Sequence, residues 1–224
     1  MRKNRKLVLY SGGQTKANHR LHRELIDLVP MKSHVSMTYI PYCYDGHDIF
    51  YKRFIKRYRH FGVSQFHCLP VDRPIDRASL KLALESDIIY LAGGNTFYFL
   101  KNLKDSGMLR YLKSFVKRGG VLAGLSAGAI ILTPEITLAG YPHFECDEND
   151  VNLENFKSLD LVDLEFFPHF DFSKRLTNAL MRYSKKSLYP IFAAEDGAGL
   201  VINGSKKTFI GKSCFFLNGQ KIEI

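Results

Sequence analysis

A serine between two glycines, where a strand-like run meets a helix-like run, restricts the fold of this chain more than any other feature. Residues 119–125 are apolar and glycine-rich, residues 127–132 continue as an apolar run, and the pattern between them is Gly124-Leu125-Ser126-Ala127-Gly128. In a nucleophile elbow, such glycines let two backbones pass closely and the serine hydroxyl is exposed at the tip of a sharp turn. A plain strand-to-helix turn with an incidental serine would give the same sequence pattern, so the choice between the two interpretations depends on other parts of the chain.

Strand-like and helix-like runs alternate along most of the chain. Besides residues 119–125, strands are expected at residues 6–10, 35–40, 64–69, 87–92, 164–167 and 187–193, and helices at residues 21–29, 51–60, 77–85, 97–103, 108–117 and 173–185. This alternation predicts an α/β fold with a doubly wound, mostly parallel sheet and helices on both faces. Asn203-Gly204 and Asn218-Gly219 predict two C-terminal β-hairpins. No linker or internal repeat divides the sequence, so residues 1–224 are expected to form a single domain.

Charge and cysteine usage narrow the class of protein. The net charge of +10 would suit a nucleic-acid partner, but the basic residues are dispersed, and their densest cluster, residues 51–60, has the spacing of an amphipathic helix with a solvated basic face. No apolar run is long enough to cross a membrane, and the basic residues at the N-terminus precede a first strand rather than a signal-peptide core. The four scattered cysteines form no CxxC pair, so reduced thiols in a cytoplasmic protein are expected.

A nucleophilic serine needs a histidine base. Two of the eight histidines occur in identical tripeptides, Pro142-His143-Phe144 and Pro168-His169-Phe170. His169 follows a strand-like run, which would place it on rigid support at a strand end. His143 lies in an acidic, turn-rich segment. The spacing therefore favours His169 over His143 as the base.

Several residues are candidates for the carboxylate that orients the imidazole, and two backbone amides are candidates for the oxyanion donors. Asp171, Glu195 and Asp196 all follow His169. Glu195 and Asp196 come at the end of an expected strand, whose end should lie near the other strand ends of a parallel sheet, although a turn beside Gly197 explains them equally well. The amide of Ala127 follows the serine directly, and the amide of Gly94 lies in a second glycine turn, so both are candidate oxyanion donors.

Several motifs taken in order resemble peptidase family S51, which contains the aspartyl dipeptidases (peptidase E) and the cyanophycinases. They are Leu91-Ala92-Gly93-Gly94-Asn95-Thr96-Phe97, then Gly124-Leu125-Ser126-Ala127-Gly128-Ala129, then Pro168-His169-Phe170 followed by Arg175, and finally Ala194-Glu195-Asp196-Gly197-Ala198. The resemblance runs from the first strand to the first hairpin. It implies a fold similar to the class I glutamine amidotransferase domain, which is flavodoxin-like, with serine in place of cysteine at the elbow.

The resemblance also implies roles for particular residues. Ser126, His169 and Glu195 would form a Ser-His-Glu triad, with Gly94 and Ala127 as the oxyanion donors. The triad would form an acyl-enzyme from a small peptide. In this implied arrangement His169 is preferred to His143, and Glu195 to Asp196.

Substrate preference follows from the same resemblance. Enzymes similar to peptidase E remove an N-terminal aspartate, which calls for a cation, and Arg175 is the candidate, with Asn95 as a second substrate-binding residue. Arg175 follows His169 more closely than in aspartyl dipeptidases, which makes a cyanophycinase-like amide hydrolase the alternative. A catalytically silent ligand-binding protein is the alternative from another class.

The expected partners and cofactors are few. The resemblance implies a small peptide substrate and, since dimers are common in the family, a homodimer. The dispersed charge and the short apolar runs predict neither nucleic acid nor membrane as partner. No cofactor is expected. No metal is expected either, because the cluster His143, Cys146, Asp147 and Glu148 has the spacing of no standard metal site.

Overall fold

A computed structural model describes residues 5–13, 16–30 and 34–224 of the chain. The basic lead-in at residues 1–4 lies outside the described residues. The helices are α1 (His19–Asp27), α2 (His47–Arg59), α3 (Arg77–Glu85), α4 (Thr96–Asp105), α5 (Met108–Lys117), α6 (Ala127–Ile130) and α7 (Lys174–Ser184), with 3-10 turns η1 (Lys16–Asn18) and η2 (Thr137–Gly140). None of the helices in the described ranges is long and apolar enough to span a membrane.

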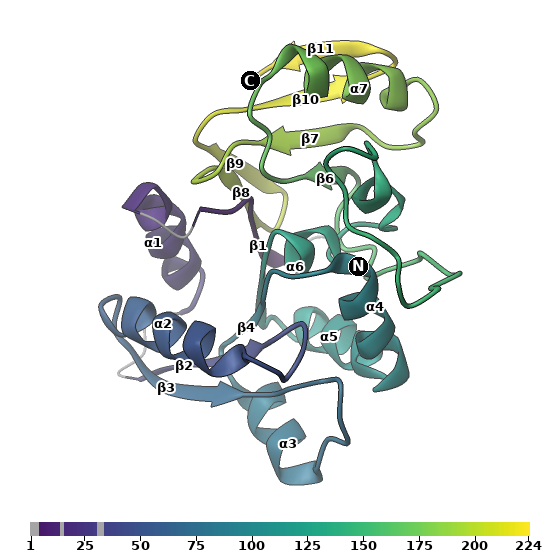
Figure 1. Cartoon of the computed structure of the whole chain (residues 1–224). Coiled ribbons are helices and arrows are strands. Elements are labelled where there is room, and N and C mark those ends of the chain that lie inside the picture. Colours follow the sequence, from purple (N-terminus) through teal and green to yellow (C-terminus); the bar gives the residue numbers. More distant parts are fainter. Residues whose placement is uncertain (1–4, 14–15, 31–33) are drawn as a thin grey trace.

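A seven-stranded sheet forms the centre of the molecule (Figure 1). Its strands, in spatial order, are β3 (Val63–Cys68), β2 (Val35–Ile40), β4 (Ile88–Leu91), β5 (Val121–Leu125), β1 (Lys6–Tyr10), β8 (Gly199–Asn203) and β9 (Lys206–Ile210). The first five are parallel, and the β8–β9 hairpin adds antiparallel strands beside β1. The predicted α/β fold with a mostly parallel sheet is confirmed.

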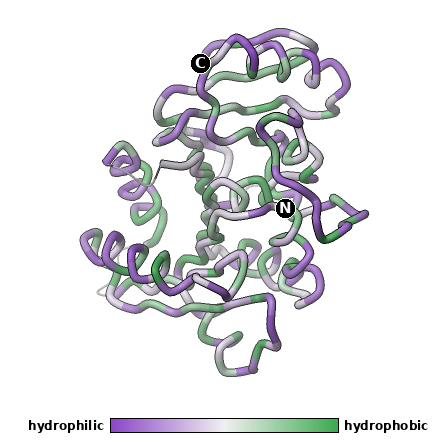
Figure 2. Tube along the Cα trace, in the orientation of Figure 1, coloured by the Kyte–Doolittle hydropathy of each residue, from purple (hydrophilic) through white to green (hydrophobic). Residues whose placement is uncertain are grey.

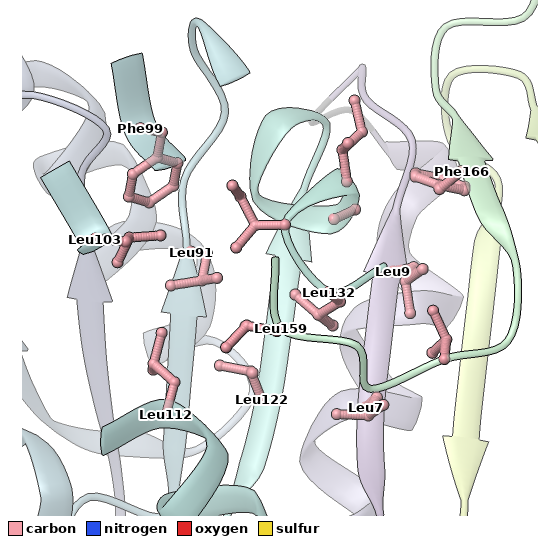
Figure 3. Close-up of a cluster of buried hydrophobic side chains, with 14 of the residues drawn as sticks. Leu7, Leu9, Leu91, Phe99, Leu103, Leu112, Leu122, Leu132, Leu159 and Phe166 are labelled. Carbon is pink, nitrogen blue, oxygen red and sulfur yellow. The ribbon is translucent and has the colours of Figure 1, made fainter. Parts of the chain in front are cut away.

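Helices cover both faces of this sheet because its buried strands are apolar on both sides. Along β1, Leu7 and Leu9 pack into a core with α3, α4, α5 and α6, whereas Val8 and Tyr10 pack into a core with α1 and α2. Figure 3 shows the first core, where Leu91 of β4 lies beside Leu103 of α4 and the same cluster continues to Leu7 and Leu9 of β1. Figure 2 shows the apolar residues concentrated along the central strands and hydrophilic residues on the outer turns of α1 and α2.

A second, four-stranded sheet differs from the sequence-based expectation. Residues 164–167 and 187–193 were expected to extend the parallel sheet. Instead, β6 (Glu165–Phe167) and β7 (Ile191–Ala194) pair with each other and join β10 (Ser213–Leu217) and β11 (Gln220–Glu223), in the order β11-β10-β7-β6. The hairpin β8–β9 occupies the edge of the main sheet beside β1, so β6 and β7 pair elsewhere. Helix α7 covers the second sheet (Figure 1).

The run after the elbow is also shorter as a helix than its apolar pattern predicts. Helix α6 ends at Ile130, and the next carbonyls bond to a returning loop: Ile131 accepts from the Leu159 amide at 3.1 Å and Leu132 from the Leu161 amide at 2.9 Å. Leu159 is buried beside Leu132 (Figure 3). Hydrogen bonds therefore hold the segment after Pro134 against the elbow, and residues of this segment line the cavity beside Ser126.

Candidate active site

The turn at Ser126 has the geometry of a nucleophile elbow. Ser126 adopts φ 50° and ψ −112°, a backbone conformation that is strained for a residue with a side chain. A Cβ atom added at Gly124 would lie 2.2 Å from the carbonyl oxygen of Gly128, and one added at Gly128 would lie 2.4 Å from that of Leu91. Both flanking glycines are therefore required by backbone contact, as the sequence pattern predicts.

His169 is the histidine that reaches this serine. The Oγ atom of Ser126 lies 2.8 Å from Nε2 of His169, which follows β6 across Pro168. His143 lines the same cavity but is not the partner in this hydrogen bond. The structure thus brings together the serine and the histidine that the sequence favours.

The carboxylate on His169 corrects one expected residue. Oδ1 of Asp196, not Glu195, lies 2.6 Å from Nδ1 of His169. The amide of Glu195 bonds to the carbonyl of Lys212 at 3.1 Å, which continues the pairing of β7 with β10. Strand β7 ends at Ala194, and Asp196 lies in the turn that follows, from which its carboxylate reaches the imidazole. Asp171, the remaining candidate, accepts the amide of Ser173 at 2.8 Å in its own turn.

The glycine loop after β1 lies directly against this pair. A Cβ atom at Gly12 would lie 2.1 Å from Cε1 of His169 and 2.5 Å from Oδ1 of Asp196. A Cβ atom at Gly13 would lie 2.8 Å from Cβ of Asp196. This loop therefore contacts two of the three polar residues, His169 and Asp196.

A second glycine turn lies beside the serine. A Cβ atom at Gly93 would lie 3.6 Å from Cβ of Ser126, and Gly94, at φ 149°, is covered by the ring of Tyr42. Among the described residues, neither the Gly94 amide nor the Ala127 amide donates to another backbone carbonyl. The two turns follow the carboxyl ends of the neighbouring parallel strands β4 and β5, since Leu91 pairs with Gly124. Two N–H groups thus lie near the serine with no backbone acceptor.

A cavity of about 380 Å³ opens in front of Ser126 and His169. Its far wall is the acidic loop (residues 143–150), whose Glu145, Asp147 and Glu148 line it. A larger cavity of about 750 Å³ lies against α7 and the start of β6, and it contains neither Ser126 nor His169. There Glu165 accepts hydrogen bonds from Tyr183 and Ser187, and burial raises the pKa of Glu165. The smaller cavity is the candidate active site because Ser126 and His169 line it, although the other cavity is larger.

Hydrogen bonds fix the acidic loop to the start of α4. Asp147 accepts the Thr96 amide at 2.8 Å and also the Thr96 hydroxyl. Asn95 caps α4 by accepting the Tyr98 amide at 2.9 Å, and its side-chain amide donates to the Glu148 carbonyl at 2.8 Å. Both polar ends of the Asn95 side chain are thus engaged inside the protein. The substrate contact that the resemblance implies for this side chain would use its second amide hydrogen or the second lone pair of its oxygen.

Arg175 lies at the margin of the cavity and not in its lining. Its guanidinium carbon stands 3.5 Å over the ring centroid of Phe144, and Phe144 lines the cavity. Arg175 is an exposed residue in the first turn of α7, whose N-terminus is capped by Ser173. Among the described residues, those lining the cavity include no lysine or arginine.

Comparison with known proteins identifies the family. The model of peptidase family S51 matches residues 7–210. The chain belongs to this family. Curated relatives include uncharacterized peptidases from Listeria monocytogenes, 36% identical over 48% of this chain, and Bacillus subtilis, 32% identical over 66% of it. A peptidase E from Salmonella heidelberg is 38% identical over 43% of this chain. The matched segments span 53%, 63% and 37% of these S51 relatives, respectively.

Solved structures share the S51 fold over nearly the whole chain. A Listeria monocytogenes protein described as a peptidase E superposes with a TM-score of 0.70 at 22% identity, covering 92% of this chain and 97% of that one. A peptidase from an acI-B1 actinobacterium gives a TM-score of 0.66 at 17% identity, covering 100% of this chain and 98% of its own.

Proposed function

We propose that this S51 peptidase is a serine-type enzyme that hydrolyses short peptides through an acyl-enzyme. The 2.8 Å contact between Ser126 Oγ, at a strained and glycine-flanked turn, and His169 Nε2 carries the proposal. A hydroxyl in this position can pass its proton to the imidazole as it attacks, which is the requirement for a serine nucleophile.

The polar residues divide the reaction between them. Ser126 Oγ would attack the peptide carbonyl carbon while His169 Nε2 takes the hydroxyl proton. His169 then returns that proton to the leaving amine, and a water molecule repeats the sequence on the acyl-enzyme to release the acid. Asp196, bonded to Nδ1 at 2.6 Å, would hold the imidazole in the required tautomer and stabilise the imidazolium. This assigns to Asp196 the role that the family resemblance implies for Glu195.

The developing negative charge needs hydrogen-bond donors. We assign this role to the amides of Gly94 and Ala127, as the sequence suggests. The support is that both lie in turns beside Ser126 and that neither donates to a carbonyl within the described backbone.

The substrate class rests on the charges around the cavity. A wall with Glu145 and Glu148 would attract the ammonium group of a free amino terminus, which favours short peptides cleaved next to their first residue. A preference for N-terminal aspartate is the finer proposal and depends on Arg175, which would have to leave the Phe144 ring to bind the side-chain carboxylate. A cyanophycinase-like amide hydrolase is the alternative within the family. A cytoplasmic location belongs to the same proposal.

A labelling experiment tests the serine mechanism. A fluorophosphonate probe should modify the intact protein at Ser126, identified by mass spectrometry of the labelled peptide, and Ser126→Ala should abolish labelling. Ser205→Ala, at an exposed turn, is the control and should label as the wild type does. An unlabelled wild type would favour a catalytically silent binding protein. Asp-X, Glu-X, β-aspartyl and neutral dipeptides then define the substrate class, and Ser126→Ala should lose at least about 10⁴-fold in turnover.

A further inference from the structure

A buried serine outside the proposed triad joins the two segments that carry His169 and Asp196. Ser11 follows β1 and is fully buried. Its hydroxyl donates to the carbonyl of Ala194 at 2.8 Å and accepts the backbone amide of His169 at 2.7 Å. Its own amide bonds to the carbonyl of Ala198 at 3.0 Å. The single hydroxyl thus connects the chain after β6 to the end of β7.

His169 needs such support because its backbone is strained. Its φ of 57° lies in the left-handed region, which is unfavourable for a residue with a Cβ atom. Such a backbone conformation is maintained only where the surrounding residues hold it in place. The amide of His169 is fixed by Ser11 Oγ, and that of Phe170 by the carbonyl of Ala194, at 2.9 Å.

The same loop also supports the imidazole ring. Gly12 lies so close that a Cβ atom would be 2.5 Å from Nδ1 of His169, and the Gly12 carbonyl accepts the Gly197 amide at 3.1 Å. Gly197 follows Asp196. The backbone and ring of the histidine, and the turn that carries its carboxylate, are therefore all held by residues 11–12.

From this geometry we infer that Ser11 is a positioning residue of the S51 site: its hydroxyl holds the His169 backbone in the turn that directs Nε2 at Ser126 and Nδ1 at Asp196. The inference rests on the proposed function, because a base must be held at this angle only if it serves the serine. Ser11 would not contact the substrate itself. Misplacing a catalytic group by about 1 Å can cost about 10²-fold in rate.

The molecule offers a matched control elsewhere. Ser184, at the end of α7, is also buried, donates to the Met181 carbonyl at 3.0 Å and accepts the Gly219 amide at 2.9 Å. Ser11→Ala and Ser184→Ala therefore remove equivalent hydroxyls, one beside His169 and one between α7 and the β10–β11 hairpin. A merely structural role predicts similar behaviour for the two variants.

The test combines kinetics with a probe of the histidine. Turnover of the best dipeptide and fluorophosphonate labelling rate are measured for wild type, Ser11→Ala, Ser11→Thr and Ser184→Ala, together with the low-field proton resonance of the His169 Nδ1–H, assigned by its loss in Asp196→Asn. We expect Ser11→Ala to lose about 10- to 100-fold in kcat with KM changed by less than about threefold, and to shift or broaden the resonance. Ser184→Ala should change neither, and Ser11→Thr, which keeps the hydroxyl, should recover most of kcat.

Equal losses in the two alanine variants, or wild-type kcat and an unmoved resonance in Ser11→Ala, would overturn the inference. If the wild type neither labels nor turns over substrate, the proposed function fails. The resonance of Ser11→Ala then still decides the positioning role, because it reports the His169 geometry without requiring activity.

Discussion

Asp196 Oδ1 lies 2.6 Å from His169 Nδ1, while the neighbouring Glu195 extends the edge of β7 and takes no part in this contact. The side chains of His169 and Asp196 are 47% and 54% exposed, so the pair is open to water until substrate covers it. A solvated pair of this kind contributes little to folding. Its value lies in orienting the imidazole, and that value can be measured apart from stability.

Removing the Asp196 charge should therefore impair activity and leave the fold intact. In Asp196→Asn we expect kcat to fall about 10²- to 10⁴-fold, because an amide can hold the imidazole in the wrong tautomer. The melting temperature should change by no more than a few degrees. Steady-state kinetics and thermal unfolding of the same preparation provide the measurement.

Glu195→Gln is the paired control, since the family resemblance favours Glu195. It should keep kcat within about threefold of the wild type, because the carboxylate bonded to His169 is that of Asp196. The reverse ranking of the two variants would restore Glu195 to the proposed triad and show that the active state differs from the arrangement described here.

Gly12→Ala should separate catalysis from folding in a different way. The new methyl group would meet the imidazole at 2.1 Å, and the ring can turn away from it. We expect kcat to fall about 10²-fold or more with moderate loss of stability.

In Gly124→Ala the methyl group would lie 2.2 Å from the backbone of Gly128. A backbone cannot move aside as a side chain can, so little folded protein should form. Gly140→Ala, whose methyl group would have a 3.4 Å contact with Phe97, is the tolerant control for expression, melting temperature and kcat.

The elbow and the parallel sheet were predictable because their causes are local. Close backbone approach requires Gly124 and Gly128, and the apolar runs of β4 and β5 fit only buried strands. The choice between Glu195 and Asp196 was not local. It depends on how far β7 remains paired with β10, and the two acids are adjacent in sequence.

The second sheet and the role of Ser11 escaped sequence reasoning for a related reason. Strands β6 and β7 are as fully buried as the central strands of the main sheet, and the later hairpins decide which strands they pair with. A serine after β1 carries no signal until the loops after β6 and β7 lie against it. The attachment of the acidic loop through Asp147 to Thr96 likewise depends on the folded structure.

Arg175 provides a direct test of aspartate preference. If its guanidinium binds the substrate carboxylate, Arg175→Ala should raise KM for Asp-X dipeptides about 10- to 100-fold, since a hydrogen bond to a charged group contributes about 1.5–3 kcal/mol. Neutral dipeptides should be affected less than about threefold. Arg182→Ala, also exposed on α7 but lining the other cavity, is the control. Equal KM changes for acidic and neutral substrates would remove Arg175 from the binding site.

Asp147 should matter for substrate binding more than for the chemical step. Asp147→Asn weakens the bond to the Thr96 amide, a capping interaction for which loss costs about 1 kcal/mol. The freed acidic loop would line the cavity less firmly, so we expect KM to rise about 3- to 10-fold with kcat nearly unchanged. Asp150→Asn, in an exposed part of the same loop, should alter neither constant. A fall in kcat alone would instead place Asp147 among the groups that act in the chemical step.

His22 should make the fold sensitive to mild acid, independently of the active site. It is 3% exposed, and its Nδ1 lies 3.0 Å from the hydroxyl of Tyr58 and 3.2 Å from that of Tyr10. Burial, aided by the positive charges of Arg57 and His19, lowers the pKa of His22 from 6.5 to about 3. The folded protein thus keeps this imidazole neutral at a pH where the unfolded chain already binds a proton.

The sign of the effect follows from that difference. Above pH 6.5 His22 is neutral in both the folded and the unfolded state, so it adds no pH dependence to the free energy of unfolding. As the pH falls from 6.5 toward 3, only the unfolded chain takes up the proton, so the free energy of unfolding should fall by about 1.4 kcal/mol per pH unit. Urea unfolding at pH 7, 6 and 5 should therefore show a loss of about 2 kcal/mol in the wild type that is missing from His22→Gln. His60→Gln, at an exposed position after α2, should retain the wild-type slope. An identical slope in His22→Gln would mean that the imidazole is protonated in the folded state and that the Tyr10–Tyr58 pocket admits its charge.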